Sequence, residues 1–262
     1  MNEVNRTLYI PLYGKAYVSR KGMLLHDPKA EEIWSKAGFP LKGKSRSKWL
    51  AYYMGMRSAV FDAWTREKIA RQDNTVVLHI GCGLDSRALR VPHEGVLWYD
   101  IDFADVIAER RLHFEETPDT RMLAADARET DWLSQIRGEH AIVLMEGVSM
   151  YMTQDELGAL LRAITQHFAS ACLLMDCYTT LAARASKYKN PINDVGVTTV
   201  HGMDDPSAIE EAAGLTFVRE HDMTPKGLID QLSGLEKPIF RRLYAGRIAK
   251  AMYRLFEYES GR

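Results

Sequence analysis

The sequence predicts an α/β protein built on a doubly wound, mostly parallel sheet. Short apolar runs alternate with helical stretches along the chain, and several of the runs end in an acidic residue. Strands that alternate with helices are typically parallel and joined by right-handed crossovers. Two runs near the end of the chain bring the expected sheet to seven strands: residues 75–80, 96–102, 121–126, 140–146, 171–176, 214–220 and 253–259.

The composition of the 262-residue chain is that of an ordinary globular protein, with 46% hydrophobic and 26% charged residues. A net charge of -1 gives no indication of a nucleic-acid partner, and no apolar run approaches the roughly 20 residues that span a bilayer. The three cysteines lack zinc-site spacing, and their odd number suits a reducing compartment. We therefore expect a cytoplasmic protein with no metal site and with no nucleic-acid or membrane partner.

A single domain is expected, because no repeat or low-complexity linker divides the chain. Its N-terminal part is a helical cap that also supplies a substrate-side segment, and its central part is the ligand-binding core. An inserted lid and the last strands of the sheet follow. In order, these parts are residues 1–74, 75–177, 178–214 and 215–262.

Helices are predicted by apolar residues that recur at steps of three and four, as they do from Trp49 to Trp64. Arg57 lies one position beyond this apolar stripe, near enough to reach beneath it. Thr153 and Glu156 have the spacing of a capping box, which marks the start of a helix. Further helical stretches separate the predicted strands at residues 103–116, 126–137 and 153–169.

The turn Gly81-Cys82-Gly83 follows the first predicted strand and indicates a close approach between backbone and ligand. A phosphate-binding P-loop is excluded, because the required Gly-Lys-Ser/Thr is absent. A dinucleotide fold would place a third glycine where Ser86 stands. The remaining large class with a glycine turn after the first strand, and an acid after the second, is the methyltransferases that bind S-adenosylmethionine.

Acidic residues at successive strand ends support this interpretation. Asp102 lies about 20 residues after the glycine turn, the usual separation for an acid that binds a ribose, and Asp100 is the second choice. Asp126, Glu146 and Asp176 end three later strands. Ligands of open parallel sheets bind beyond the carboxyl ends of the strands, so these carboxylates should meet along one rim.

Three segments of the chain resemble the leucine carboxyl methyltransferase family: "VVLHIGCGLDSRALR", "LWYDIDFADVIAERR" and "LMEGVSMYM". The N-terminal "TLYIPLYGKAYVSRKGMLLHDPKAEEIW" and the later "HGMDDPSAIEEAAGLTFVRE" resemble its bacterial branch, which includes an O-methyltransferase of polyketide synthesis. Ser86 replaces the usual threonine of the family, and Ala104 replaces a common proline.

The resemblance implies a class I methyltransferase fold, S-adenosylmethionine as cofactor and S-adenosylhomocysteine as its product. Arg57 would pair with the carboxylate of the methionine part, and Glu146 would face its amino group. The remaining implied residues are Gly81 and Gly83 for close approach, Asp102 for the ribose, Asp126 with Ala127 for the adenine, and Tyr151 near the transferred methyl.

A small-molecule acceptor is expected, and we expect a carboxylate rather than a hydroxyl. A hydroxyl acceptor needs a base, whereas a carboxylate is already a nucleophile at neutral pH. No convincing base is evident, because His201 is a loop residue and His79 is interpreted as a buried, hydrogen-bonded strand residue.

The substrate side of the cleft is expected to be covered by two segments. Aromatic rings and cations in the first segment can hold a planar acid, and a lid at residues 178–205 forms the second. The substrate-binding candidates in the first segment are Tyr9, Tyr13 and Arg20.

Three alternatives remain open at this point: a methyltransferase for a protein C-terminal carboxylate, a non-catalytic cofactor-binding homologue, and a nicotinamide oxidoreductase. The absence of the third glycine at Ser86 weakens the last of these.

Overall fold

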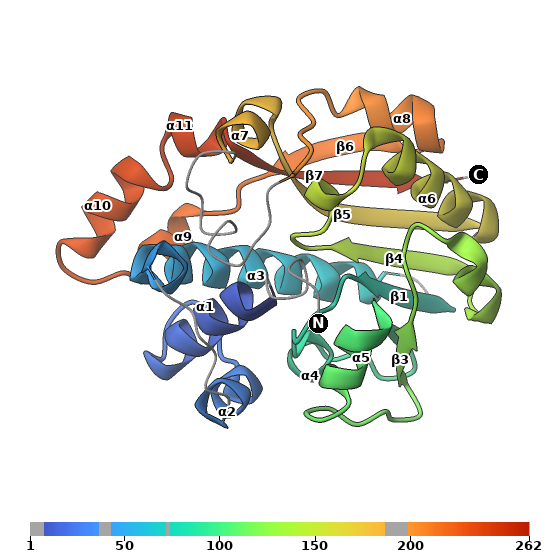
Figure 1. Cartoon of the computed structure of the whole chain (residues 1–262), viewed down its shortest axis with the longest axis horizontal. Coiled ribbons are helices and arrows are strands. Elements are labelled where there is room, and N and C mark those ends of the chain that lie inside the picture. The colour runs from blue at the N-terminus through green and yellow to red at the C-terminus, as the bar shows by residue number, and fades with distance from the viewer. Residues whose placement is uncertain (1–7, 37–42, 72–73, 187–198, 262) are drawn as a thin grey trace.

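The computed structural model describes residues 8–36, 43–71, 74–186 and 199–261. It contains a seven-stranded sheet in the order β3-β2-β1-β4-β5-β7-β6 (Figure 1). The strands are β1 (Thr75–Ile80), β2 (Leu97–Asp102), β3 (Thr120–Ala124), β4 (His140–Met145), β5 (Ser170–Tyr178), β6 (Thr216–His221) and β7 (Tyr253–Ser260). Each of the seven predicted strands is confirmed to within a few residues.

The sheet is parallel from β3 to β5, and β7 is antiparallel to both of its neighbours. The strand order reverses beside β1, where β2 lies on one side and β4 on the other. A ligand site is expected beyond the carboxyl ends of the strands at such a reversal. The predicted doubly wound, mostly parallel fold is thereby confirmed.

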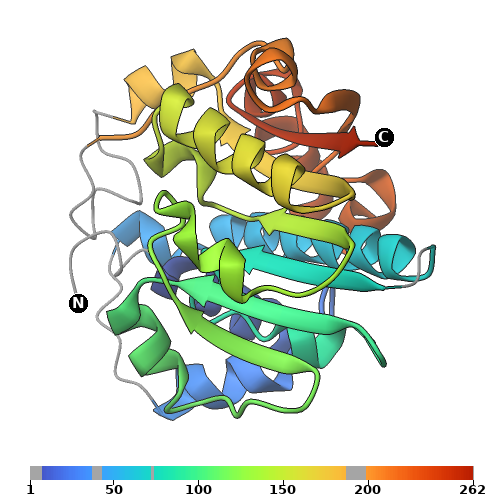
Figure 2. The same ribbon diagram turned by 90° about the vertical axis from the view of Figure 1, so that its right-hand side faces the viewer.

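Helices cover both faces of the sheet (Figure 2). Along β1, Leu78 packs on the face covered by α6 (Gln154–His167), whereas Val77 packs on the face covered by α3 (Lys48–Ile69). All six residues of β1 are buried. A strand with both faces covered reads as a continuous apolar run, which explains the pattern seen in the sequence.

The N-terminal helix α1 (Tyr9–Arg20) lies beside α3, and α2 (Pro28–Lys36) packs against α1 (Figure 1). The long helix α3 begins after Ser47, whose side chain accepts a hydrogen bond from the Trp49 amide. The predicted capping box of α6 is confirmed, because Thr153 and Glu156 bond each other's backbone amides. These caps satisfy amides that a helix leaves unpaired at its start.

The helices between β2 and β4 are shorter than predicted. The stretch expected to be helical at 103–116 forms α5 (Ala104–Arg110), and the stretch at 126–137 forms the 3₁₀ helix η3 (Thr130–Gln135). Two other 3₁₀ helices are η2 (Gly43–Arg46) and η4 (Ser149–Tyr151). The short α4 (Arg87–Arg90) follows the glycine turn.

The predicted lid begins with α7 (Thr180–Ala185) and ends at α8 (Ser207–Ala213), while residues 187–198 lie outside the described residues. Between β6 and β7 the chain forms α9 (Lys226–Ile229), α10 (Glu236–Leu243) and α11 (Arg247–Lys250). Within the described part of the chain, none of the helices has the length and hydropathy needed to cross a membrane.

We expect Phe256→Ala on β7 to lower the free energy of unfolding by about 3–5 kcal/mol, because the ring is fully buried in the core. Val218→Ala on the edge strand β6 is the control, since Val218 is 43% exposed. Denaturant unfolding followed by circular dichroism measures both changes. An equal loss of unfolding free energy in Phe256→Ala and Val218→Ala would contradict the position of β7 inside the sheet.

Candidate active site

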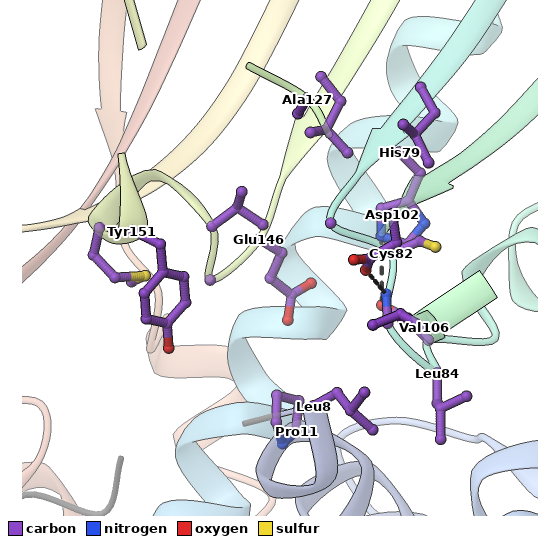
Figure 3. A pocket seen from close by; sticks show the side chains of 18 of the residues that line it. Leu8, Pro11, His79, Cys82, Leu84, Asp102, Val106, Ala127, Glu146 and Tyr151 are labelled. Carbon is purple, nitrogen blue, oxygen red and sulfur yellow. Dashed lines mark hydrogen bonds and ion pairs between the residues drawn. The ribbon is translucent and has the colours of Figure 1, made fainter. Parts of the chain in front are cut away.

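A cavity of about 370 Å³ lies beyond the carboxyl ends of β1, β2 and β4. Figure 3 shows Glu146 and Tyr151 on one side of it, Asp102 and Val106 on the other, and Leu8 and Pro11 facing them from the N-terminal region. Cavities of this size hold small ligands and cofactors. All the residues predicted for the cofactor, together with Tyr151, line this one cavity: Arg57, Gly81, Gly83, Asp102, Asp126, Ala127 and Glu146.

Gly81 occupies a position that only glycine can fill without strain. Its φ is +66°, and a Cβ atom built there would lie 2.2 Å from Cγ2 of Val148. Its amide donates to the carbonyl of Ile101, which holds the turn against the neighbouring strand β2. The backbone can therefore form the floor of the cavity with no side chain in the way.

Asp102 stands at the end of β2 with both carboxylate oxygens bonded to backbone. One oxygen accepts from the Gly83 amide at 2.8 Å and the other from the Phe103 amide at 2.8 Å. Burial raises the pKa of Asp102 to about 6, although these two amides oppose the shift. The carboxylate is thus ionised at neutral pH, and its lone pairs remain able to accept bonds from a ligand.

Asp126 and Ala127 line the cavity just after β3. Arg128 donates to the Asp126 carboxylate at 2.6 Å, which lowers the pKa of Asp126. Arg128 is well exposed, so this end of the cavity opens toward solvent.

Arg57 on α3 reaches the opposite end of the cavity, where its Nε donates to Glu146 at 3.0 Å. Its Nη1 donates to Asp176 at 2.9 Å and to the phenol oxygen of Tyr253 at 2.6 Å. Burial on its own would raise the pKa of Glu146, but the guanidinium groups of Arg87 and Arg57 outweigh it and lower that pKa. The two residues predicted for the amino-acid end of the cofactor are therefore a buried ion pair.

Two charged residues at the site, Asp85 and Arg87, were not predicted. Arg87 donates to Glu146 and, at 2.7 Å, to Asp62. Lys15 on α1 lines the cavity and pairs with Asp85 at 3.0 Å. Asp85 and Arg87 lie within the "GLDSR" segment, so their charges in a buried turn were the signal available in the sequence.

His79 is a buried strand residue, as interpreted from the sequence, and it is part of the cavity lining. Its Nδ1 is 3.0 Å from Asp100, which also accepts from Arg110. Burial lowers the pKa of His79, which is neutral at neutral pH as a result. Asp100 is used by these two partners, whereas Asp102 faces the cavity, so the structure favours Asp102 over Asp100 as the ligand-facing acid.

The predicted substrate residues of the N-terminal segment do not line the cavity. Tyr13 is buried and donates to the carbonyl of Arg46, Tyr9 packs in the same apolar cluster, and Arg20 is exposed and donates to the carbonyl of Glu31. The described part of this segment that lines the cavity is Leu8, Ile10, Pro11, Leu12 and Lys15. The helical period of α1 turns the tyrosines away from it.

Two solved structures with this fold are named as methyltransferases. A putative methyltransferase from Thermobifida fusca aligns with a TM-score of 0.57 and 13% identity, covering 90% of this chain and 88% of that one. The magnesium protoporphyrin IX methyltransferase of Synechocystis aligns with a TM-score of 0.52 and 13% identity, over 89% and 94% of the two chains. The fold is therefore that of the class I methyltransferases.

The leucine carboxyl methyltransferase family model matches residues 10–165, and the chain belongs to this family. The family comprises S-adenosylmethionine-dependent methyltransferases. The chain is 28% identical to the tetracenomycin polyketide synthesis O-methyltransferase of Streptomyces glaucescens, over 89% of this chain and 88% of that protein. It is 30% identical to the S-adenosyl-L-methionine-dependent methyltransferase dpfgK of Gibberella zeae, over 73% and 71%.

We expect Gly81→Ala to weaken binding of S-adenosylhomocysteine at least about tenfold, because its Cβ would displace Val148 at the cavity floor. Isothermal titration calorimetry measures the affinity. Gly214→Ala is a matched control, since Gly214 has the same φ of +66° but no atom within 4 Å of the point where a Cβ would lie. An equal change in affinity in both variants would show that backbone strain, and not the close approach, is responsible.

Proposed function

We propose that this protein is an O-methyltransferase that transfers the methyl group of S-adenosylmethionine to a small-molecule acceptor, and that the acceptor group is a carboxylate. The observation that carries the proposal is that one cavity is lined by all the parts the reaction requires. They are the glycine turn at Gly81, the carboxylate of Asp102, the buried ion pair of Arg57 and Glu146, and a group of apolar and aromatic side chains. Membership of the leucine carboxyl methyltransferase family supports it.

The polar end of the cavity fits the cofactor. Asp102 offers carboxylate oxygens to vicinal hydroxyls, and Gly81 leaves room for the ligand above the backbone. Arg57 and Lys15 supply positive charge for a carboxylate, and Glu146 supplies negative charge for an ammonium group. When bound there, the cofactor supplies an electrophilic methyl group on a positively charged sulfur.

Another part of the cavity lining is apolar and aromatic. Ile10, Leu50, Tyr151 and Tyr178 line it and pack in one cluster. Such a lining excludes water from the acceptor and holds it by its apolar body.

The described residues of this cluster that line the cavity carry no carboxylate or imidazole that could remove a proton from a hydroxyl. In the rest of the lining, Glu146 has two arginine partners that lower its pKa, Nδ1 of His79 is 3.0 Å from Asp100, and Asp102 is assigned to the cofactor. An acceptor that arrives ionised needs no base. An apolar chamber also favours a transfer that brings a negative acceptor to a positive donor, because their attraction grows as the local dielectric falls.

The comparisons also favour a small molecule over a protein C-terminus as the acceptor. The relative from Streptomyces glaucescens, which this chain matches over 89% of its length, is named for polyketide synthesis.

We expect affinity for S-adenosylhomocysteine to fall as the pH drops below about 6, by up to roughly tenfold per unit. The ligand's hydroxyls donate to the ionised form of Asp102. Because the pKa of Asp102 is raised to about 6, its carboxylate becomes protonated below that pH and accepts these bonds less well. Calorimetric titrations at about pH 5 and about pH 8 measure the change. Asp102→Asn should bind weakly at both values, and a dependence that survives in this variant would assign the titration to another group.

We expect the methyl product to be an ester. Incubation with radiolabelled S-adenosylmethionine and a panel of small carboxylic acids and phenols should give a label that mild base releases as methanol. A base-stable product formed from the phenols alone would show that the acceptor is a hydroxyl. A melting-temperature increase with NAD and none with S-adenosylhomocysteine would overturn the proposed cofactor.

A further inference from the structure

Three polar side chains form a triangle of hydrogen bonds beside Glu146, in the part of the cavity proposed to hold the amino-acid part of the cofactor. Arg57 comes from α3, Asp176 from β5 and Tyr253 from the antiparallel strand β7. Tyr253 donates to Oδ2 of Asp176 at 2.6 Å and accepts from Nη1 of Arg57 at 2.6 Å. Nη1 of Arg57 also donates to Oδ2 of Asp176 at 2.9 Å.

We propose that Asp176 and Tyr253 are positioning residues for the cofactor: they hold Nη1 of Arg57 and so leave its Nη2 to meet the cofactor carboxylate. This inference rests on the proposed function, in which Arg57 binds that carboxylate. Within the described residues, Nε donates to Glu146 and Nη1 to the triangle, while Nη2 makes no hydrogen bond.

Asp176 also shapes the cavity wall beside Arg57. Its Oδ1 accepts from the amide of Gly147 at 2.7 Å, so one carboxylate holds both the arginine and the turn after β4. Gly147 has a φ of +74°, and a Cβ atom built there would lie 3.4 Å from Nη1 and 3.5 Å from Nη2 of Arg57. The glycine therefore keeps the wall over the guanidinium free of a side chain.

The phenol of Tyr253 is fixed by its neighbours and stays protonated. Its ring stacks on Tyr53 with centroids 6.2 Å apart and meets Tyr178 edge-on at 4.8 Å. Burial raises the pKa of Tyr253 well above its usual range, so the hydroxyl keeps the proton that it donates to Asp176. This ring lines the cavity as well, which places the triangle at its edge.

An arginine side chain loses considerable rotamer freedom when it is fixed in one geometry. Because the triangle already fixes Arg57 in the free protein, this loss of side-chain entropy does not oppose ligand binding. The triangle acts at the amino-acid end of the cofactor, and the nucleoside end faces Asp102 and Asp126 instead. Loss of the triangle should therefore weaken ligands that carry the amino-acid part and spare ligands that lack it.

The test compares two ligands in Tyr253→Phe, which removes the hydroxyl and keeps the ring packing. Calorimetry should show an affinity for S-adenosylhomocysteine about tenfold weaker than that of the unchanged protein, because a hydrogen bond to a charged group is lost. The affinity for 5′-methylthioadenosine, which lacks the amino-acid part, should change by less than about twofold. In turnover, KM for S-adenosylmethionine should rise with little change in kcat.

Tyr258→Phe is the matched control. Tyr258 lies on the same strand and is fully buried, and its hydroxyl donates to the carbonyl of Pro206 at 3.2 Å, away from the cavity. Tyr258→Phe should lower the melting temperature about as much as Tyr253→Phe does. It should leave the affinities for S-adenosylhomocysteine and 5′-methylthioadenosine unchanged. Asp176→Asn provides a second variant, which keeps an acceptor for Gly147 and should show the same selective loss.

Unchanged affinity for S-adenosylhomocysteine in Tyr253→Phe, or an equal loss for both ligands, would overturn the positioning role. A general effect of destabilised packing would appear in Tyr258→Phe too, and that result would also overturn it. Failure of the unchanged protein to bind S-adenosylhomocysteine is a separate outcome, which overturns the proposed function itself.

Discussion

The site depends on one constraint: charges removed from water must be paired. A dense set of buried acidic and basic side chains lies under and beside the cavity, and each member is paired with a side chain of the opposite kind: Lys15, Asp27, Arg57, Asp62, Asp85, Arg87, Arg90, Glu146 and Asp176. Removal of one partner from such a pair typically costs about 3–5 kcal/mol, because the other charge is left buried and alone. The network therefore stabilises one arrangement of the helices around the site rather than adding much net stability.

Helix α3 connects this network to the sheet. Its Arg57, Ser58 and Asp62 bond residues that follow β1 and β4, and Arg57 also bonds Asp176 within β5. Its apolar residues, such as Phe61 and Trp64, pack on the sheet itself. The 22 residues of α3 thus supply both the apolar side chains that pack on the sheet and the polar side chains that enter the charged network.

The sequence predicted the parts of the fold and site that local pattern controls. The strands were recognisable because β1 and β4 are buried on both faces, and the glycine turn was recognisable because Gly81 has no tolerated substitute at its φ. Long-range pairing was not predictable, because nothing local shows that Asp85 pairs with Lys15 or that Arg87 reaches Asp62. Packing also determines how far the helices after β2 and β3 extend and which face of α1 lines the cavity. Periodicity alone does not specify either of these.

The antiparallel strand β7 has a consequence for the order in which the site can form. Arg57 and Tyr253 are 196 positions apart in the chain, and β6 has β7 as its partner in the sheet. Contacts between distant residues incur their loop-closure entropy before they contribute stability, so they form late in folding. A chain emerging from the ribosome can assemble β1 to β5 well before β7 arrives. The part of the cavity around Arg57 is then completed last, and an incompletely synthesised chain would lack a finished site.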